Sequence, residues 1–256
     1  DDYPKVTKDN PFKLHHDISN AWEVIRITSG FADMTTVTTS YLASEVSEFA
    51  KNVVVLPNYM NMERWDLQPK LRNESGTVRI GFAGSITHLV DMQMINNVLI
   101  RIANEFPQTE FYFVGDLRMS TMFKDLPRAE FMLGTDMETW PTKLQGLRYD
   151  IGIAPLVNKL FSRCKSPIKF YEMAIIKAAF VCSPTVYKYE VEDGVTGLIA
   201  HNEEEWYQHL KRLVLDRELR ERLGNAAYDY VKTNKSLEDH IGEWATAYKS
   251  LMKKKK

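Results

Sequence analysis

The spacing of apolar residues changes in a regular way along the middle of the chain. Short apolar runs alternate with longer segments in which apolar residues recur every three or four positions. The first pattern predicts buried strands and the second predicts amphipathic helices. The predicted strands cover 78–84, 110–116, 131–133, 149–156, 179–183 and 197–199. The helices predicted between them include 91–106 and 140–147. Because strands and helices alternate at this pitch, the pattern predicts an α/β fold with a parallel, doubly wound sheet.

The first sixty residues contain a smaller set of elements. Residues 1–20 are polar and predicted to be irregular or partly helical, and 21–31 has helical spacing, although its β-branched residues keep a strand open as the alternative. A short strand at 36–39, a helix capped by Ser40 and an apolar strand at 53–56 follow. So few strands predict the end of a parallel sheet, a remnant of a Rossmann-like domain.

Residues 59–76 have no clear periodicity and contain turn-forming residues, so they are predicted to be a linker. The last part of the chain has helical spacing over 203–215, 217–231 and 237–251. These helices are predicted to be packing elements. The final Lys253–Lys256 run is interpreted as a solvated tail, with weak attraction to an anionic membrane surface as the alternative.

The segment 161–172 combines a predicted helix start with an unusual distribution of charge. Ser166 is predicted to cap the helix and Pro167 to take its first position. Three cations, Arg163, Lys165 and Lys169, surround this positive end of the helix dipole, which normally favours acids. A bound diphosphate would reverse the repulsion, and Glu172 further along could accept hydrogen bonds from sugar hydroxyls. A surface helix with a basic first turn is the simpler alternative.

The composition limits the classes of function. A chain of 256 residues with 44% apolar and 26% charged residues is typical of a globular protein with a sizeable core. The net charge of −1 gives no strong nucleic-acid signal. Two cysteines form neither a disulfide framework nor a metal-spaced cluster, which indicates a reducing compartment. No membrane span or secretory leader is found, so the expected location is cytoplasmic or peripheral at a membrane. The chain begins at Asp1 without Met, which suggests a fragment or a trimmed product.

Several loops should meet at one edge of the predicted sheet. Gly84-Ser85, Gly115-Asp116 and the loop 157–166 each follow a strand. Parallel doubly wound sheets bind ligands outside the carboxyl ends of their strands. The sequence therefore predicts a ligand site at this edge.

Three further side chains have two interpretations each. His88 follows the glycine loop and would face a bound sugar or lie in solvent. Arg118 would reach a phosphate or pair with Asp116, and Tyr187 would stack near the ligand or pack under its loop. The pair His15-His16 has no third ligand nearby in sequence, so no metal site is predicted.

The order of these motifs resembles the C-terminal half of a GT-B glycosyltransferase of the large retaining group called family four, or glycosyl transferases group 1. The resemblance rests on VVLPN at 54–58, IGFAGSITH at 80–88, FVGD at 113–116, YDIGIAPL at 149–156, KSPIKFYEMA at 165–174 and EDGVTGL at 192–198. It covers nearly the whole chain. The domains it implies are the end of an acceptor-side domain (1–58), a linker (59–76), a nucleotide-sugar-binding domain (77–236) and a return helix with a basic tail (237–256).

The resemblance implies a nucleoside-diphosphate-sugar donor as substrate, no separate cofactor and an unknown acceptor such as a saccharide or lipid. By analogy, Glu172 would hold the ribose, and Lys169, Lys165 and the N–H groups after Ser166 would neutralise the diphosphate. Gly84 and Ser85 would let the backbone approach the phosphates. The implied catalytic residues are Lys169, Glu172 and His88, and the implied binding residues are Gly84, Ser85, Gly115, Arg118, Lys165, Ser166, Pro167, Ile168 and Tyr187.

Three departures keep a second function open. The family often has Glu where Cys164 stands, and Gly and Pro where Lys177 and Ala179 stand. Only the last pieces of the acceptor-side domain are present. The expectation is a hexosyltransferase-like enzyme of which this chain carries the donor half, its activity in this shortened form left open, with a non-catalytic nucleotide-sugar-binding or scaffold module as the alternative. A nicotinamide-dependent oxidoreductase is disfavoured because no Gly-x-Gly-x-x-Gly opens the first helix.

Overall fold

The computed structural model describes residues 20–253, which form two compact units. The larger unit comprises residues 61–157 and 167–234. The smaller unit comprises the described parts of 1–60, 158–166 and 235–256. The chain therefore passes between the two units more than once.

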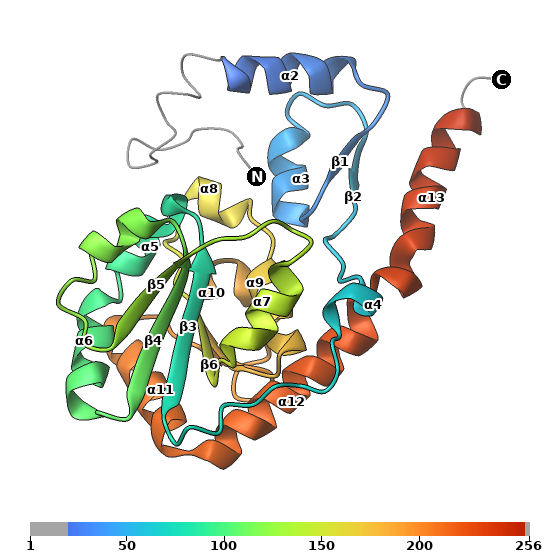
Figure 1. The fold of residues 1–256 in the computed structure, drawn as a ribbon. Coiled ribbons are helices and arrows are strands. Elements are labelled where there is room, and N and C mark those ends of the chain that lie inside the picture. Colours follow the sequence, from blue (N-terminus) through green and yellow to red (C-terminus); the bar gives the residue numbers. More distant parts are fainter. Residues whose placement is uncertain (1–19, 254–256) are drawn as a thin grey trace. The chain divides into compact units, whose positions relative to one another are not determined.

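A six-stranded parallel sheet forms the centre of the larger unit, with strand order β5-β4-β3-β6-β7-β8 (Figure 1). The strands are β3 (Val78–Gly84), β4 (Thr109–Gly115), β5 (Ala129–Leu133), β6 (Ile151–Ala154), β7 (Ala179–Cys182) and β8 (Leu198–Ile199). The order reverses between β3 and β6, since the chain first moves outward to β4 and β5 and then returns. This reversal is the point where doubly wound sheets bind ligands. The predicted fold class is confirmed.

Helices and helical turns precede, connect and follow these strands. They are α4 (Met62–Trp65), η1 (Ile86–His88), α5 (Leu89–Gln93), α6 (Asn96–Glu105), η2 (Leu117–Thr121), α7 (Trp140–Leu147), α9 (Ile168–Ile175), α10 (Pro184–Tyr187), α11 (Glu203–Leu215) and α12 (Arg217–Asn234). Asn202 caps α11 by accepting from the Glu205 N–H at 2.9 Å. Three acidic residues in the first turn of α11 complement the helix dipole.

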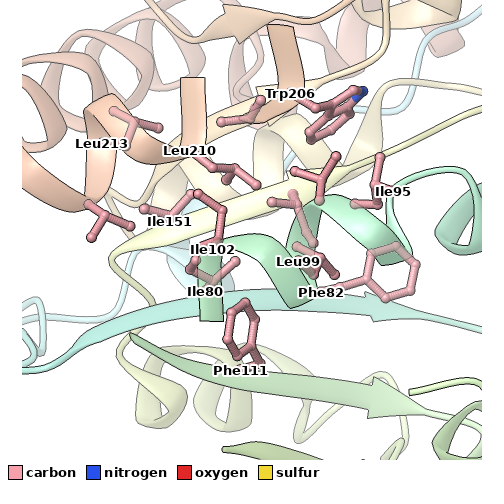
Figure 2. Packing of buried hydrophobic residues seen from close by; sticks show 14 of the residues in the cluster. Ile80, Phe82, Ile95, Leu99, Ile102, Phe111, Ile151, Trp206, Leu210 and Leu213 are labelled. Atoms are coloured by element: carbon pink, nitrogen blue, oxygen red, sulfur yellow. The ribbon is translucent and has the colours of Figure 1, made fainter. Parts of the chain in front are cut away.

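The main hydrophobic core lies between the sheet and helices α6 and α11 (Figure 2). Ile80, Phe111 and Ile151 of the strands are fully buried. They share this cluster with residues of α6 and α11 such as Leu99 and Leu210. Burying each such side chain contributes about 1.5–3 kcal/mol. Because other helices cover the opposite face, the strands are apolar on both sides, which explains their uninterrupted apolar runs.

The smaller unit contains α2 (Ala21–Phe31), β1 (Thr35–Val37), α3 (Ser40–Val46), β2 (Val53–Val55), α8 (Leu160–Arg163) and α13 (Leu237–Lys253). Strands β1 and β2 pair in parallel. A small core of Val37, Leu42, Val46, Ala50 and Cys164 holds α3, the strands and the 158–166 segment together. Backbone bonds from Met60 to Lys235 and from Leu237 to Met60, both 2.8 Å, attach the start of α13.

Several predicted boundaries need correction. Thr39, not Ser40, caps α3, because the Thr39 side chain accepts from the Leu42 N–H at 3.1 Å. The predicted single helix from 91 to 106 is interrupted between α5 and α6 at Met94 and Ile95. Short helices α4, α8 and α10 occupy segments predicted as linker or loop. The helices predicted at 21–31, 140–147 and 203–215 are confirmed.

Between residues 20 and 253, none of the helices combines the length and the apolar character needed to cross a lipid bilayer.

Candidate functional site

Glycines at the carboxyl ends of β3 and β4 bring two backbones together without side chains between them. Gly84 and Gly115 are partners in the parallel register. Gly115 has φ +148°, and a Cβ added there would overlap the carbonyl oxygen of Gly84. A Cβ on Gly84 would stand 2.7 Å from Phe82 Cζ and 3.0 Å from His88 Cδ2. Only glycine fits at both positions, so exposed backbone lies at this edge of the sheet.

The loop after β3 carries a buried histidine–aspartate pair. Ser85 is exposed, and its hydroxyl is 2.6 Å from that of Thr87. His88 is only 8% exposed, and its Nδ1 lies 2.8 Å from Asp91 Oδ2. The other Asp91 oxygen accepts from the Val157 N–H at 2.8 Å. The Asp91 carboxylate therefore connects the loop after β3 with the segment after β6.

Lys169 reaches the same edge from the first turn of α9. Its Nζ donates to the carbonyl oxygen of Ala83 and lies 5.0 Å from the centre of the Phe82 ring. The same Phe82 ring also contacts the His88 ring edge to face, with 5.7 Å between the ring centres. A lysine and a histidine thus both contact the last residues of β3.

Glu172 lies one helical turn after Lys169 on α9 and is half-buried. Its Oε1 accepts from the Trp140 indole N–H at 2.8 Å. Burial raises the pKa of the Glu172 carboxyl, while the charge of Lys169 and the Trp140 hydrogen bond act in the opposite direction. A carboxylate kept partly out of water can accept strong hydrogen bonds from ligand hydroxyls.

Tyr187 packs inside the larger unit, which matches the second of its two predicted positions. It is 3% exposed, and its ring meets Phe180 edge to face at 5.4 Å. Burial raises the pKa of its phenol, and the charges of Asp91 and Glu172 raise it further. This coupling shows that Tyr187 lies in the electrostatic field of both carboxylates.

Arg118 is paired with Asp116, as one of its two predicted interpretations has it. The guanidinium Nε donates to both Asp116 oxygens at 2.9 and 3.0 Å. These bonds lower the pKa of the Asp116 carboxyl to about 2. Arg118 also lines a pocket of about 580 Å³ with Ile86, Leu89 and Met122, between the loops that follow β3 and β4. Neither Gly84 nor Gly115 is among the residues that line it.

Segment 161–166 belongs to the smaller unit, and the predicted Ser166 cap is wrong. Helix α9 begins at Ile168 with Pro167 in the cap position and no side-chain cap bond. The Ser166 hydroxyl instead accepts from Asn58 Nδ2 at 2.9 Å. The Pro167 carbonyl accepts from the Phe170 N–H at 2.9 Å, which closes the first turn.

The cations predicted to crowd the start of α9 have protein partners. Arg163 Nε donates to Asn158 Oδ1 at 2.7 Å, and Lys165 Nζ lies 4.8 Å from the centre of the Phe161 ring. Lys169 contacts Ala83 and Phe82, as described above. Because all three cations have partners in the protein, their mutual repulsion does not indicate a ligand at this edge.

Asp91 and Trp140 were not predicted from the sequence. Asp91 follows His88 by three positions, a spacing at which helical side chains meet, so a signal was present. Trp140 is 32 positions from Glu172 and has no such local signal.

No group of three His, Cys, Asp or Glu side chains able to hold a metal occurs within residues 20–253. The His15-His16 pair lies outside the described residues.

No protein-family model and no curated protein sequence matches the chain. Several solved structures match the chain. HepE from Anabaena in complex with UDP and glucose aligns with a TM-score of 0.70 at 14% identity, over 93% of this chain and 68% of that chain. The C-terminal domain of LpcC from Francisella tularensis, a glycosyl transferase group 1 family protein, aligns with a TM-score of 0.53 at 16% identity, over 70% of this chain and 99% of that chain.

The chain has the fold of group 1 GT-B glycosyltransferases. S. aureus TarM, in a complex that contains UDP, aligns with a TM-score of 0.69 at 14% identity. The alignment covers 89% of this chain but 46% of TarM, so the chain spans about half the length of that glycosyltransferase. The LpcC domain confirms that the six-stranded sheet corresponds to the C-terminal domain of a GT-B protein.

Proposed function

We propose that the chain binds a nucleoside-diphosphate sugar at the carboxyl edge of its sheet, and that the protein transfers the sugar with retention of configuration. The observation that carries this proposal is the placement of Lys169 and the bare backbone of Gly84 and Gly115 at the reversal point of the sheet. Of the GT-B structures with the same fold, HepE is bound to UDP-glucose.

In this proposal Lys169 and the backbone beside Gly84 and Ser85 would contact the diphosphate. The nucleoside diphosphate is the leaving group, so it gains negative charge as the bond to the sugar breaks. A lysine fixed in advance by Ala83 stabilises that charge without reorganisation. Losing one such group typically raises the barrier by about 2.7–4 kcal/mol.

Glu172 would accept hydrogen bonds from the ribose hydroxyls of the donor. Trp140 holds Oε1 and so fixes the plane of the carboxylate. Around these two residues, we assign donor contacts to Gly115, Arg118, Pro167 and Ile168, while Tyr187 is buried and packs under its loop. Lys165 and Ser166 belong to the smaller unit, and their donor contacts stay a prediction from the sequence.

The acceptor would be a saccharide, a lipid or another hydroxyl compound, and the parent activity would be hexosyl transfer. A cytoplasmic location with weak attraction of the lysine run to an anionic membrane surface belongs to the same proposal. Five lysines and no acidic residue follow Glu243, which supports the electrostatic part.

Calorimetric titration with UDP and with GDP tests the donor site. The wild-type chain is expected to bind one of them with a dissociation constant of about 1 μM to 1 mM, the usual range for substrates. Lys169→Ala should weaken binding at least about tenfold. Lys211→Ala is the matched control, because that lysine pairs with Glu105 on α6, at 2.7 Å. Equal binding to wild type and Lys169→Ala, or no binding, would rule the site out.

One observation favours a non-catalytic nucleotide-sugar-binding module as the second candidate. Cys164 stands where the family often has a glutamate, and it is fully buried in the core of the smaller unit. Burial and the charge of Glu45 raise the pKa of its thiol to about 11, so it does not supply a carboxylate-like charge. Sugar transfer by the protein would exclude this candidate.

A further inference from the structure

The His88–Asp91 pair extends the proposed donor site, and the inference drawn from it depends on that proposed function. A carboxylate only accepts hydrogen bonds, so the 2.8 Å contact with Asp91 Oδ2 requires that His88 Nδ1 carries a proton. The second oxygen of Asp91 is held by the Val157 N–H at 2.8 Å. With both oxygens engaged and only 4% of the residue exposed, Asp91 is fixed in place. The orientation of the His88 ring is fixed with it.

The opposite edge of the His88 ring faces the glycine backbone. Cδ2, the carbon bonded to Nε2, lies 3.0 Å from the position that a Cβ on Gly84 would take. The ring also packs edge to face against Phe82. Nε2 is bonded to Cδ2, so it belongs to the ring edge on the Gly84 side.

The charged groups around the ring determine its response to such a ligand. Asp91 on α5 contacts it directly, and Lys169 Nζ on α9 lies 5.0 Å from the centre of the Phe82 ring that His88 also contacts. Glu172 on α9 and Asp91 both act on the Tyr187 phenol of α10. An anion on each side of an imidazole favours its protonated form, since opposite charges within a few ångströms stabilise a cation.

We propose that Asp91 is a positioning residue that holds His88 with Nδ1–H toward the carboxylate, so that binding of a donor diphosphate protonates Nε2 and makes His88 a second cation beside Lys169. In the protonated form, Nε2–H donates to a diphosphate oxygen. The proton comes from solvent and is released when the nucleotide leaves. Neither the family resemblance nor the sequence motifs assign a role to Asp91.

The isosteric change Asp91→Asn gives a specific test. Its amide oxygen still accepts from the Val157 N–H, but its NH₂ group donates to His88 Nδ1. The neutral ring must then carry its proton on Nε2. Nitrogen-15 NMR of labelled histidine in the free chain should show the Nδ1–H tautomer in wild type and the Nε2–H tautomer in Asp91→Asn. The same tautomer in both proteins would overturn the positioning role.

Binding of UDP-glucose at several pH values gives the second readout, because its diphosphate does not titrate between about pH 5 and 8, where histidine does. Wild type should bind at least about fivefold more tightly at about pH 6 than at about pH 8, since proton uptake accompanies binding. Asp91→Asn should bind with little pH dependence, because its neutral ring already has Nε2–H to donate. An unchanged pH dependence in Asp91→Asn would contradict the proposal.

The two readouts separate failure of this inference from failure of the donor site. If wild type binds no UDP-glucose at any pH, the donor site and the phosphate contact of His88 both fail, while the NMR tautomer still decides whether Asp91 positions the ring. If Asp91→Asn does not fold, His88→Gln replaces it: its binding should lose the pH dependence of wild type, and retention of that dependence would overturn the role of His88.

Discussion

The two edges of the six-stranded sheet are both rich in charged residues, but they use charge differently. At the carboxyl edge, Lys169, Glu172 and His88 lie half-buried or buried beside bare glycine backbone. The amino edge has a pocket of about 380 Å³, lined among others by Thr77, Asp150, Lys177 and Arg220. The presence of a pocket alone would therefore not show which edge binds a ligand.

The charged groups of the amino edge are engaged in bonds that hold the fold. Asp150 Oδ2 accepts from Asn73 Nδ2 and from the Arg79 N–H, both at 2.8 Å. Arg220 donates to the carbonyl oxygens of Leu213 and Val214 at the end of α11. These bonds satisfy backbone groups that a helix end or strand start would otherwise leave unpaired.

At the carboxyl edge, burial acts against the charged form of an acidic side chain. The Glu172 pKa is raised by burial, so its ionised form is less favourable there than in water. Strain and desolvation that do not benefit the fold tend to occur at functional sites. The comparison teaches that bare glycine backbone beside half-buried charged groups, rather than the presence of a pocket, distinguishes the proposed binding edge from a structural one.

Of the changes that test this comparison, replacing glycine should have the largest effect on stability. Gly115→Ala would place a Cβ against the Gly84 carbonyl and is expected to destabilise the chain by about 3 kcal/mol. Gly76→Ala at the amino edge meets no atom within 4 Å and has only its φ of +82° to strain it. It should cost about 1 kcal/mol. Urea unfolding measures both, and equal costs would contradict the close approach at the carboxyl edge.

Trp140→Phe removes the hydrogen bond to Glu172 and should cost about 1–2 kcal/mol at pH 7. The folded-state pKa of Glu172 is already raised by burial, and losing the indole donor raises it further. An acid whose pKa is raised by folding stabilises the folded state when the pH is below the pKa of the unfolded state. This contribution is lost as the pH rises through the pKa of the folded state. The penalty should therefore be smaller at about pH 4 than at pH 7. Urea unfolding at both values checks the direction.

Glu172→Gln and Asp150→Asn should have opposite effects on stability. The glutamine keeps an acceptor for Trp140 and removes a charge that burial disfavours, so it is expected to stabilise the chain by about 1 kcal/mol at pH 7. Asp150→Asn weakens two hydrogen bonds and should destabilise by about 1 kcal/mol. Only Glu172→Gln should weaken UDP binding. Destabilisation by both changes would refute the contrast between the edges.

The smallest effect is expected at Arg148, which ends α7 in the left-handed conformation with φ 55°. Arg148→Gly should relieve this strain and stabilise the chain by about 0.5–1 kcal/mol, without changing UDP binding. Thermal unfolding with and without UDP measures both quantities. A loss of stability would show that the arginine side chain contributes more than its backbone costs.

Local pattern was sufficient to predict the parallel sheet and most helices. The apolar runs at 78–84 and 179–183 have no polar interruption, so their burial follows from the sequence. Glycines at 84 and 115 also marked the carboxyl ends of β3 and β4, because strand ends can be read along the chain. Capping was less predictable: Thr39 and Ser40 are both good caps, and only the backbone geometry distinguishes them.

Contacts between distant segments were the part that the sequence could not supply. The bonds from Trp140 to Glu172, from Lys169 to Ala83 and from Asn58 to Ser166 join residues 32, 86 and 108 positions apart. The last of these displaced the predicted cap. Lys177 stands where the family often has Gly. It adopts the left-handed conformation with φ 59°, in which glycine would be unstrained.

Amide hydrogen exchange with and without UDP tests most directly whether the carboxyl edge is the nucleotide site. The account predicts that UDP slows exchange in the loop 85–88 and the first turn of α9, and leaves 74–78 and 214–221 at the amino edge unchanged. Slower exchange confined to the amino edge, or no change at either edge with saturating UDP and GDP, would contradict it.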